Sequence, residues 1–588
     1  MKSYIKHFIQ MVSLGLTHTT PYRIGRAEGA FFLFSLLFIA CSPSVPDSFV
    51  EVDALPAIYP DYINVTVPVN IAPLHFHIDC EAEAADFVTR FTAGAEEWAI
   101  EGEDVRPGLK RWQQMKAAAL KANGQITIEV FIQQDGQWQR RKPFSITISK
   151  DSIDPYISYR LISPSYVTYE DLTINQRCLE NFEESLIYGN MINSDEENGQ
   201  CINCHHAQWY NPNRVQFHVR QYLGGTVIAY DNKLQKINLK TDSTISAGVY
   251  PTWHPTKPWI VYSTNSTGQS FHTRDAQKIE VQDTKSNLIF YNLETNEVTP
   301  ITRDTTDLDC FPFWSPDGKY IYYVSCHWER RDTLQMDFEF IKHYKDVQYN
   351  LYRKPFNEKT LTFGPRELMY DAIARNRSVT LPRVSPDGRW LMFTEGQFGV
   401  FHIWHSDADL FLMDLTQAEP TEPTLVTRFN TKNLPDEYYA HTKNNVELDH
   451  IVDSLNEAQG AQHALPASIR NIQELNSSDV ESWHCWSSNG AWVIFSSRRD
   501  DGNFTRPFIA HHDGNGHFAR PFELPQDNPQ YHRQFMRSYN IPEFLSGPVT
   551  IKPQEFATII KKDATPAQLR ISNKAIDGHT AASPKAPK

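Results

Sequence analysis

Apolar and polar residues along the chain follow patterns that predict mainly β structure. Gln125 to Val130 and Phe144 to Ile148 alternate apolar and polar residues with a period of two, which is typical of strands with one buried face. Before these two stretches, Trp112 to Leu120 has a helix-like pattern. We therefore expect a small, mainly β domain over residues 55–150.

A second pattern is a repeat of four similar stretches. They read TWHPTKPWIVYST from Thr252, FWSPDGKYIYYVS from Phe313, RVSPDGRWLMFTE from Arg383 and CWSSNGAWVIFSS from Cys485. In each, a turn leads into an aromatic residue and a short apolar strand, and three contain the Asp-Gly or Asn-Gly pair that tight turns favour. Four-stranded units that recur at intervals of roughly 60 residues or more are typical of β-propeller blades. We predict a propeller over residues 224–552; the alternative is a sandwich of unrelated hairpins.

Three stretches lack these patterns. Residues 151–223 are less regular, yet they hold seven tyrosines and a tryptophan, which argues against disorder; we expect an irregular functional segment there. Residues 435–475 are polar and helix-prone, which indicates an insertion between blades. From residue 553 to 588 the pattern fades into TAASPKAPK, and we expect a disordered tail.

The N-terminal region has the pattern of an export signal. Four basic residues precede the apolar run AFFLFSLLFIA, whose 11 residues are too few to span a bilayer as a helix. The next residues, Phe38-Ile39-Ala40-Cys41, resemble a bacterial lipobox, in which the cysteine becomes the first mature residue and carries the lipid. We expect a signal peptide over 1–40, lipidation at Cys41 and a tether over 41–54. An ordinary signal peptide that ends near a cysteine is the alternative.

Composition narrows the possible partners and the location. The chain has 588 residues and a formal net charge of -14, so nucleic acid and anionic membrane surfaces should repel it. We therefore expect no nucleic-acid function and a membrane association through the lipid alone. The residues after Cys41 include no acidic cluster. We expect the protein in the bacterial cell envelope, on the periplasmic face of the outer membrane.

The strongest chemical signal is GQCINCHH, which begins at Gly199. Two cysteines three positions apart, Cys201 and Cys204, followed by His205, form the Cys-x-x-Cys-His pattern of covalent haem c attachment. The thiols would add to the two vinyl groups of one porphyrin edge, and His205 would be the proximal ligand of the iron. Two alternatives remain: a zinc site in which Cys178 completes a Cys₃His set, and a Cys201–Cys204 disulfide.

A low-spin haem needs a sixth iron ligand and partners for its propionates. His218 is far enough from His205 in sequence to fold back over the ring, and Met191 is the other local candidate. An ordinary hydrogen-bonded strand histidine is an equally good explanation of His218. Arg214 and Arg220 could pair with the propionates, or they could be solvated charges.

Other polar residues near the predicted blade starts allow two explanations. These residues are His402, His405, Asp407 and His484. A ligand or metal site is one explanation, and packing with strand-end hydrogen bonds is the simpler one. The sequence contains no nucleophile elbow, phosphate-binding loop or HExxH zinc motif.

On these motifs the chain resembles bacterial envelope proteins that join a C-x-x-C-H segment to a TolB-like propeller. Such proteins are often labelled cytochrome c biosynthesis protein or TolB-like translocation protein. The resemblance rests on CINCHHAQWYNPNRVQFHVRQYLGGT, on PRVSPDGRWLMFTEGQFGVFHIWHSDADLFLMDL, on NSSDVESWHCWSSNGAWVIFSSRRDDGNFTRPF and on PQYHRQFMRSYNIPEF. It covers roughly residues 55–550. It implies a six-bladed propeller and one haem c, but no assigned activity. Val215-Gln216 stands where members have a methionine, so a methionine ligand from that position is in doubt.

The sequence thus favours a lipid-anchored, periplasm-facing monohaem cytochrome with a propeller docking domain. It would transfer single electrons or sense redox state, with an unknown envelope protein as its redox partner. Two alternatives belong to other classes: a TolB-like interaction scaffold in which Cys-x-x-Cys-His is structural, and a propeller hydrolase or lyase that acts on glycans or peptides. We expect an electron carrier or a binding protein rather than a hydrolase.

Overall fold

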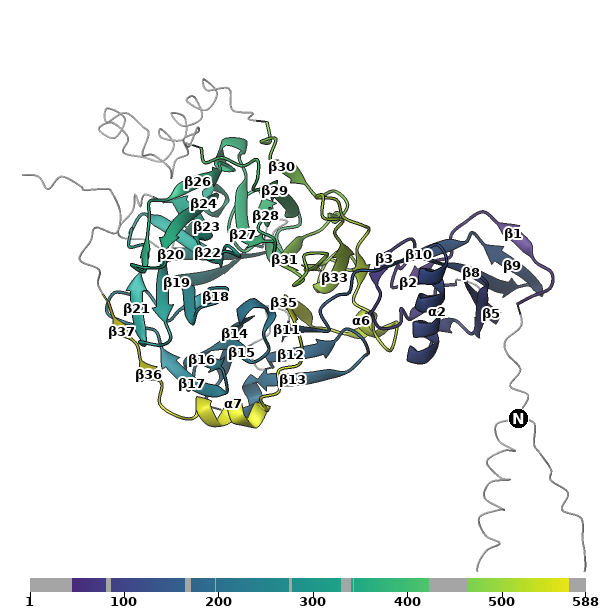
Figure 1. Ribbon diagram of the computed structural model, residues 1–588, viewed down its shortest axis with the longest axis horizontal. Coiled ribbons are helices and arrows are strands. Elements are labelled where there is room, and N and C mark those ends of the chain that lie inside the picture. The colour runs from purple at the N-terminus through teal and green to yellow at the C-terminus, as the bar shows by residue number, and fades with distance from the viewer. Residues whose placement is uncertain are drawn as a thin grey trace, which may run out of the picture. The chain divides into compact units, whose positions relative to one another are not determined.

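The computed structural model describes residues 45–80, 86–163, 171–195, 197–273, 278–328, 340–341, 343–421 and 464–570. These residues are mainly β, as the sequence predicts, and they form a small N-terminal domain and a propeller (Figure 1). The signal peptide and Cys41 lie outside the described residues. In the part of the chain that is described, no helix is both long and apolar enough to cross a membrane.

The N-terminal domain is built on a seven-stranded sheet. Five of its strands have the order β1-β9-β8-β10-β3; β5 also pairs with β8, and β6 pairs with β5. Its strands are β1 (Val50–Val52), β3 (Thr66–Pro68), β5 (Asp86–Ala93), β6 (Glu96–Glu101), β8 (Gln125–Gln134), β9 (Gln137–Arg141) and β10 (Phe144–Ser149). A smaller sheet holds β2 (Ile58–Tyr59), β4 (Phe76–Ile78) and β7 (Asp104–Val105). Helix α2 (Leu109–Lys121) buries Trp112, Met115 and Ala119, whose spacing places them on one face. The predicted helix-like stretch and both predicted strands are thereby confirmed.

Within the described residues, the propeller strands group into six antiparallel units, of which the third and fourth belong to one continuous sheet. The first unit combines β35 (Ser538–Leu545) with β11 (Tyr156–Ile162), β12 (Thr173–Cys178) and β13 (Glu184–Gly189). The second contains β14 (Gln200–Ala207), β15 (Arg214–Gln221), β16 (Gly225–Tyr230) and β17 (Lys233–Asn238), and the third contains β18 (Val249–Trp253), β19 (Trp259–Phe271), β20 (Ile279–Asn292) and β21 (Glu297–Pro300). The C-terminal strand β35 therefore completes the unit that the N-terminal part of the propeller begins.

The remaining three units follow in chain order. The fourth contains β22 (Asp307–Trp314), β23 (Tyr320–His327) and β24 (Asn350–Asn357), with β25 (Thr362–Phe363) and β26 (Glu367–Tyr370) both paired to β24. The fifth contains β27 (Ser378–Val384), β28 (Trp390–Gly396), β29 (Asp409–Asp414) and β30 (Ile469–Asn471). The sixth contains β31 (Glu481–Trp486), β32 (Trp492–Ser497), β33 (Arg506–His511) and β34 (Phe522–Glu523). Short helices lie between strands: η1 (Asn190–Ile192), η2 (Gln208–Tyr210), η3 (Tyr344–Asp346), η4 (Ile373–Arg375), η5 (His402–Trp404) and α6 (Tyr531–Gln534).

The inner strands of the six units form a closed ring. Each of β14, β18, β22, β27, β31 and β35 contacts the next, and β35 contacts β14 again. Figure 1 shows the units following one another around this centre. The four repeated stretches that begin at Thr252, Phe313, Arg383 and Cys485 lie at the inner and second strands of units three to six. Their turns have the predicted geometry, because Gly318, Gly388 and Gly490 have φ angles of 69°, 78° and 70°.

Two predictions about irregular regions are wrong. Residues 151–223 form five strands rather than an irregular segment, because many of their polar side chains are buried between units and break the expected alternation; examples are Gln176, Gln200 and Gln216. The predicted tail begins with helix α7 (Pro553–Ile560), which buries Phe556 and Ile560. Strands β36 (Thr565–Pro566) and β37 (Gln568–Leu569) then pair with β17 and β21. Residues 571–588 lie outside the described part.

The predicted helical insertion over 435–475 lies mostly outside the described residues, because 422–463 are not described. The part that is described contains no helix and ends in the edge strand β30 of the fifth unit.

Candidate ligand cavity at the centre of the propeller

The residues of GQCINCHH lie in β14, the inner strand of the second unit. Cys201 pairs with Arg220 of β15 and Asn203 pairs with His218, after which the register shifts before His206. The shift is a β-bulge at Cys204, whose backbone has a φ of 57°. The motif is thus part of the sheet, and both cysteines and His205 are buried.

The same bulge occurs once in each of the six inner strands. Every strand has one residue with a φ between 48° and 57° next to a register shift. These residues are Cys204, Tyr250, Phe311, Leu381, Trp483 and Ile541. The residue that follows the bulge is proline in four strands, at Pro251, Pro312, Pro382 and Pro542, and histidine in two, at His205 and His484. Cys204-His205 therefore occupies a position that every inner strand of the propeller has.

All six bulge residues meet around one narrow space at the centre of the ring. This space has a volume of about 20 Å³, which is room for a single water molecule. His205 and Glu543 also line it. Burial, more than the neighbouring Glu543 and Arg160, sets the acidity of His205 and lowers its pKa to about 4. Burial likewise raises the pKa of the Cys204 thiol.

The haem c expected at Cys201, Cys204 and His205 does not fit this arrangement. Covalent attachment requires both thiols at one porphyrin edge and the histidine below the ring. Cys204 and His205 line the narrow central space, whereas Cys201 lines the larger cavity that adjoins it. A macrocycle cannot lie against His205 unless the inner strands of the propeller move apart. We therefore derive no chemistry through a haem.

The candidate haem partners lie in different surroundings. His218 is buried in β15, where its Nδ1 lies 3.2 Å from Oγ1 of Thr226, and burial lowers its pKa to about 3. Met191 is 58% exposed in η1. Arg214 forms an ion pair with Asp231, with 2.7 Å between Nε and Oδ1, and stacks on Tyr230. The structure does not bring these three residues together around His205; Arg220, by contrast, lines the larger cavity beside Cys201.

The two alternatives for the cysteines gain no geometric support. In the described part of the chain, no group of three or more His, Cys, Asp or Glu is arranged to hold a metal ion. Cys178, Cys201 and Cys204 are free thiols.

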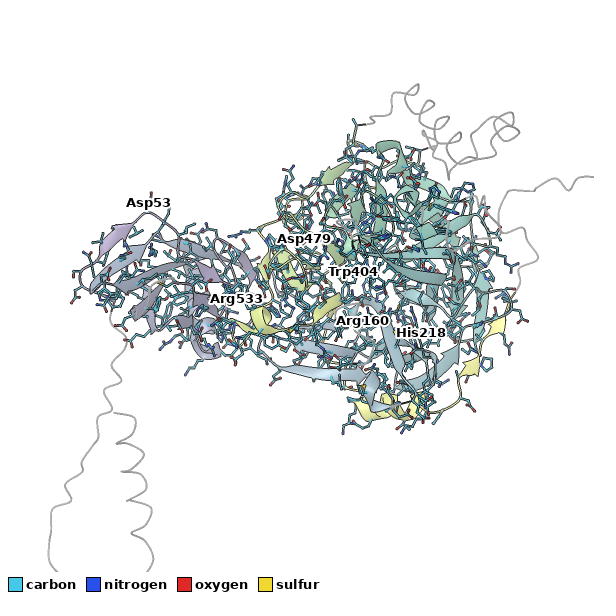
Figure 2. The ribbon with its side chains drawn as sticks, turned by 180° about the vertical axis from the view of Figure 1, so that it is seen from behind. Asp53, Arg160, His218, Trp404, Asp479 and Arg533 are labelled. Carbon is cyan, nitrogen blue, oxygen red and sulfur yellow. The ribbon has the colours of Figure 1, made fainter. Side chains whose placement is uncertain are left out.

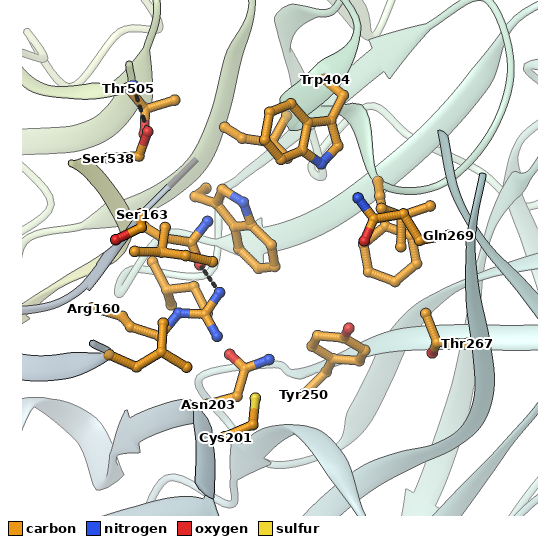
Figure 3. Close-up of a pocket in the computed structure, with 18 of the residues that line it drawn as sticks. Arg160, Ser163, Cys201, Asn203, Tyr250, Thr267, Gln269, Trp404, Thr505 and Ser538 are labelled. Atoms are coloured by element: carbon orange, nitrogen blue, oxygen red, sulfur yellow. Dashed lines mark hydrogen bonds between the residues drawn. The ribbon is translucent and has the colours of Figure 1, made fainter. Parts of the chain in front are cut away.

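The larger cavity lies at one side of the bulge ring and has a volume of about 340 Å³. Side chains from the first, second, third, fifth and sixth units line it. In the view of Figure 3, Arg160, Asn203 and Cys201 lie on one side of the cavity and Trp404 on the opposite side. Figure 2 marks Arg160 and Trp404 within the propeller. Cavities of this size in propellers are suited to small ligands.

Polar and aromatic groups dominate the wall of this cavity. The aromatic residues are Tyr250, Phe401, Trp404 and Trp483, and the cationic residues are Arg160, Arg220 and Arg498. Arg498 is paired, because its Nη2 lies 2.9 Å from Oδ1 of Asp479. No aspartate or glutamate lines the cavity among the residues that the structure describes. The cavity is thus positively charged inside an acidic protein.

On the other side of the bulge ring, a smaller hollow holds the residues two positions after each bulge. These residues are His206, Thr252, Phe313, Arg383, Cys485 and Glu543. Glu543 links two of them: Oε2 lies 3.1 Å from Nδ1 of His206, and Oε1 lies 3.8 Å from Nη2 of Arg383. The charges in this hollow are therefore balanced within the protein.

The histidines near the blade starts have local partners. His405 Nε2 lies 2.9 Å from Oε2 of Glu280, and both side chains are 1% exposed. His402 Nε2 is within hydrogen-bond distance of the carbonyl oxygens of Phe398 and Gly399, and His484 Nε2 of that of Met392. Asp407 accepts a hydrogen bond from Arg377. Each of the four residues therefore has at least one partner within the protein, as the packing explanation expects.

Sequence reasoning missed the residues that define the cavity, above all Arg160, Trp404 and Trp483. Arg160 lies in the stretch YISYRLI, where a single charge interrupts an otherwise apolar strand. An arginine in such an apolar strand is expected to be buried. Because arginine is rarely buried without a partner, the position indicates a site where its guanidinium binds one. Trp483 could have been found by aligning the six bulges.

Comparisons with known proteins give only distant likenesses. No family model matches the chain, and no curated protein is similar to it in sequence. Among solved structures, a puromycin-hydrolysing peptidase of Mycobacterium tuberculosis is 9% identical with a TM-score of 0.29, and covers 69% of this chain. A GH74 enzyme of Niastella koreensis is 10% identical with a TM-score of 0.30, and covers 72% of it. The chain spans 52% of the length of each of these two proteins. A DUF4784 family protein of Bacteroides caccae is 8% identical with a TM-score of 0.23; the match covers 63% of this chain and 97% of that protein.

Proposed function

We propose that this chain is a β-propeller binding protein of the bacterial cell envelope, in which CINCHH is a structural strand and the central cavity takes a ligand. The lipid anchor at Cys41 and the periplasmic location belong to this proposal. They rest on the N-terminal sequence alone.

The observation that carries the proposal is the equivalence of the six inner strands. Cys204 has the same bulge as five other residues of unrelated type, and His205 stands where four strands have proline. A position that accepts leucine, isoleucine, tyrosine, phenylalanine and tryptophan serves packing at the centre of the ring rather than one cofactor. This favours the scaffold alternative over the monohaem cytochrome.

The test is a direct measurement of haem. The full chain is produced in cells that contain the haem-maturation machinery, and its haem is determined by the pyridine haemochrome assay and by intact mass. We expect far less than one haem per chain and no mass increase. The matched control is the Cys201→Ala, Cys204→Ala double variant, which should give the same spectrum as the wild type. About one covalent haem per chain, lost in the double variant, would overturn the proposal in favour of the cytochrome.

A further inference from the structure

We infer that the larger central cavity binds a small organic anion, whose acidic group is held by Arg160 and whose ring packs against the aromatic wall. This inference rests on the proposed function, because a haem attached at Cys201 would occupy the same cavity.

Arg160 is the first element of the argument. It lies in β11, opposite Asn540 of β35, and is 8% exposed. Its Nη1 donates to the carbonyl oxygen of Ile202 at 3.3 Å and its Nη2 donates to Oδ1 of Asn540 at 3.1 Å. Both acceptors are neutral, and Nε has no partner. A guanidinium has five N–H donors and a full charge, so at this depth an opposite charge is missing.

The surroundings of Arg160 do not supply that charge. No carboxylate lines the cavity in the described ranges, and Arg220 adds a second positive charge to the wall. Asp283 is a buried carboxyl outside the wall that interacts electrostatically with Arg220. It accepts hydrogen bonds from Oγ1 of Thr267 at 2.6 Å and from Nδ2 of Asn265. A cavity with this charge distribution concentrates anions from solution.

A second donor without a partner belongs to a residue that lines the same cavity. Trp483 is 8% exposed, and its Nε1 has no hydrogen-bond partner. Two buried donors that lack acceptors, Nε of Arg160 and Nε1 of Trp483, are matched by a ligand with oxygen acceptors. Carboxylates, sulfates and phosphates have such oxygens, and the flat carboxylate suits the guanidinium fork best.

The aromatic wall defines the rest of the ligand. Tyr250, Phe401, Trp404 and Trp483 surround the space beside Arg160. Flat rings, whether aryl or sugar, pack against such side chains, and a volume of about 340 Å³ is at the lower end of the range for small-molecule sites. The ligand class is therefore a monocyclic organic acid.

The experiment compares acidic and neutral probes of the same shape. Benzoate is titrated against benzamide, and glucuronate against glucose, by calorimetry with the full chain. At least one acid should bind ten-fold or more tightly than its neutral partner, and bound ligand should change the tryptophan fluorescence. The better acid identifies the ring as aryl or sugar.

Variants assign the binding to the site. Arg160→Met should remove the preference for the acid, with a loss of affinity of ten-fold or more. Arg160→Lys should recover only part of it, because lysine lacks the fork geometry. Arg214→Met removes an arginine on β15 that lies outside the cavity, and it should leave affinity within two-fold of the wild type. If Arg160→Met does not fold, Trp483→Phe tests the site by removing the other donor and keeping a ring.

Three results would overturn the inference. The first is equal affinity for the acids and their neutral partners, and the second is unchanged acid binding in Arg160→Met or Trp483→Phe. The third is sulfate binding as tight as that of either acid, which would indicate an adventitious ion only. None of these measurements involves haem. A haem-free protein that does not bind the organic acids would therefore refute this inference without contradicting the proposed function.

Discussion

His206 and Glu543 join the second unit of the propeller to the strand that completes the first. The Nδ1 atom of His206 in β14 lies 3.1 Å from Oε2 of Glu543 in β35, and the carboxylate is 7% exposed. The second histidine of CINCHH thus makes a contact that holds two neighbouring inner strands together. It is a structural contact that needs no cofactor.

The first prediction follows from the acidity of Glu543. Burial alone would raise the pKa of Glu543. His206, His205 and Arg383 together lower it by more than burial raises it, so the pKa is below its usual value. A carboxyl with a depressed folded pKa stabilises the protein above its unfolded pKa, and this stability is lost as pH falls through the folded pKa. Glu543→Gln should therefore lower stability at pH 7 by roughly 1.5–3 kcal/mol. Urea unfolding followed by fluorescence should show the difference shrinking below about pH 4.

The control for this prediction is Asp231→Asn, which removes an exposed ion pair with Arg214. That change should cost less than about 1 kcal/mol at any pH, because surface pairs are screened by water. A Glu543→Gln effect as small as this control would mean that the pair with His206 does not hold the two strands.

The second prediction exploits the equivalence of the six bulges. His205 stands where four inner strands have proline, so His205→Pro should fold and keep the thermal midpoint of the wild type or raise it slightly. Cys204→Pro should fail to fold or melt far earlier, because the φ of 57° at Cys204 cannot be adopted by proline. Thermal melts of the two variants decide the question. Collapse of His205→Pro would show that His205 has a role that proline cannot fill.

The third prediction concerns acid sensitivity. His205 has a folded pKa of about 4, so the folded protein holds it neutral while the unfolded chain protonates it at about 6.5. The unfolded state thus binds more protons between these values, and stability falls as pH falls from about 6.5 to 4, by at most about 3.4 kcal/mol for this residue. His205→Pro should be less acid-sensitive than the wild type in unfolding curves at pH 7 and pH 4.5. Parallel pH profiles of the two proteins would exclude this contribution.

The fold was predictable where local chemistry determines it. Asp317-Gly318 and its two counterparts specify tight turns, and the aromatic strands after them specify blades, so these elements follow from the sequence. Strands β11 to β15 were not predictable in this way, because some of their buried side chains are polar and interrupt the alternation of apolar and polar residues. Gln216, for example, is buried and accepts a hydrogen bond at its Oε1 from Tyr262 of the neighbouring unit, at 2.8 Å. The cavity depends on strands that are far apart in sequence, since Arg160 and Asn540 meet only when β35 closes the ring.

The Cys-x-x-Cys-His motif shows a different limit. A sequence motif predicts chemistry only in a particular backbone conformation, and in β14 the bulge turns Cys204 away from the cavity that Cys201 faces. An alignment of VYPTW, CFPFW and NIPEF with NCHHA identifies Cys204-His205 as one of several equivalent positions, which the motif alone does not indicate.

The fourth prediction tests the C-terminal helix. Phe556 of α7 is fully buried and packs on Phe217 with a ring distance of 5.3 Å. Phe556→Ala should cost about 3–5 kcal/mol and lower the thermal midpoint clearly. Thr558→Ala, at an exposed position of the same helix, should change stability by about 0.5 kcal/mol or less. Equal melting of the two variants would mean that the helix adds nothing to the propeller.

The last prediction concerns the anchor at Cys41, which lies outside the described residues. If Cys41 carries the lipid, Cys41→Ser should release the protein from membranes, because the lipid would be its attachment and the described residues include no helix long and apolar enough to cross a bilayer. Fractionation after a salt wash should place the wild type in the membrane pellet and the variant in the soluble fraction, with equal thermal midpoints for both. Cys80→Ser, a change at a partly buried free cysteine of the N-terminal domain, is the matched control and should stay with the membranes. A Cys41→Ser protein that still sediments would place the anchor elsewhere. An exported wild type that is soluble would instead favour an ordinary signal peptide that is cut near this cysteine.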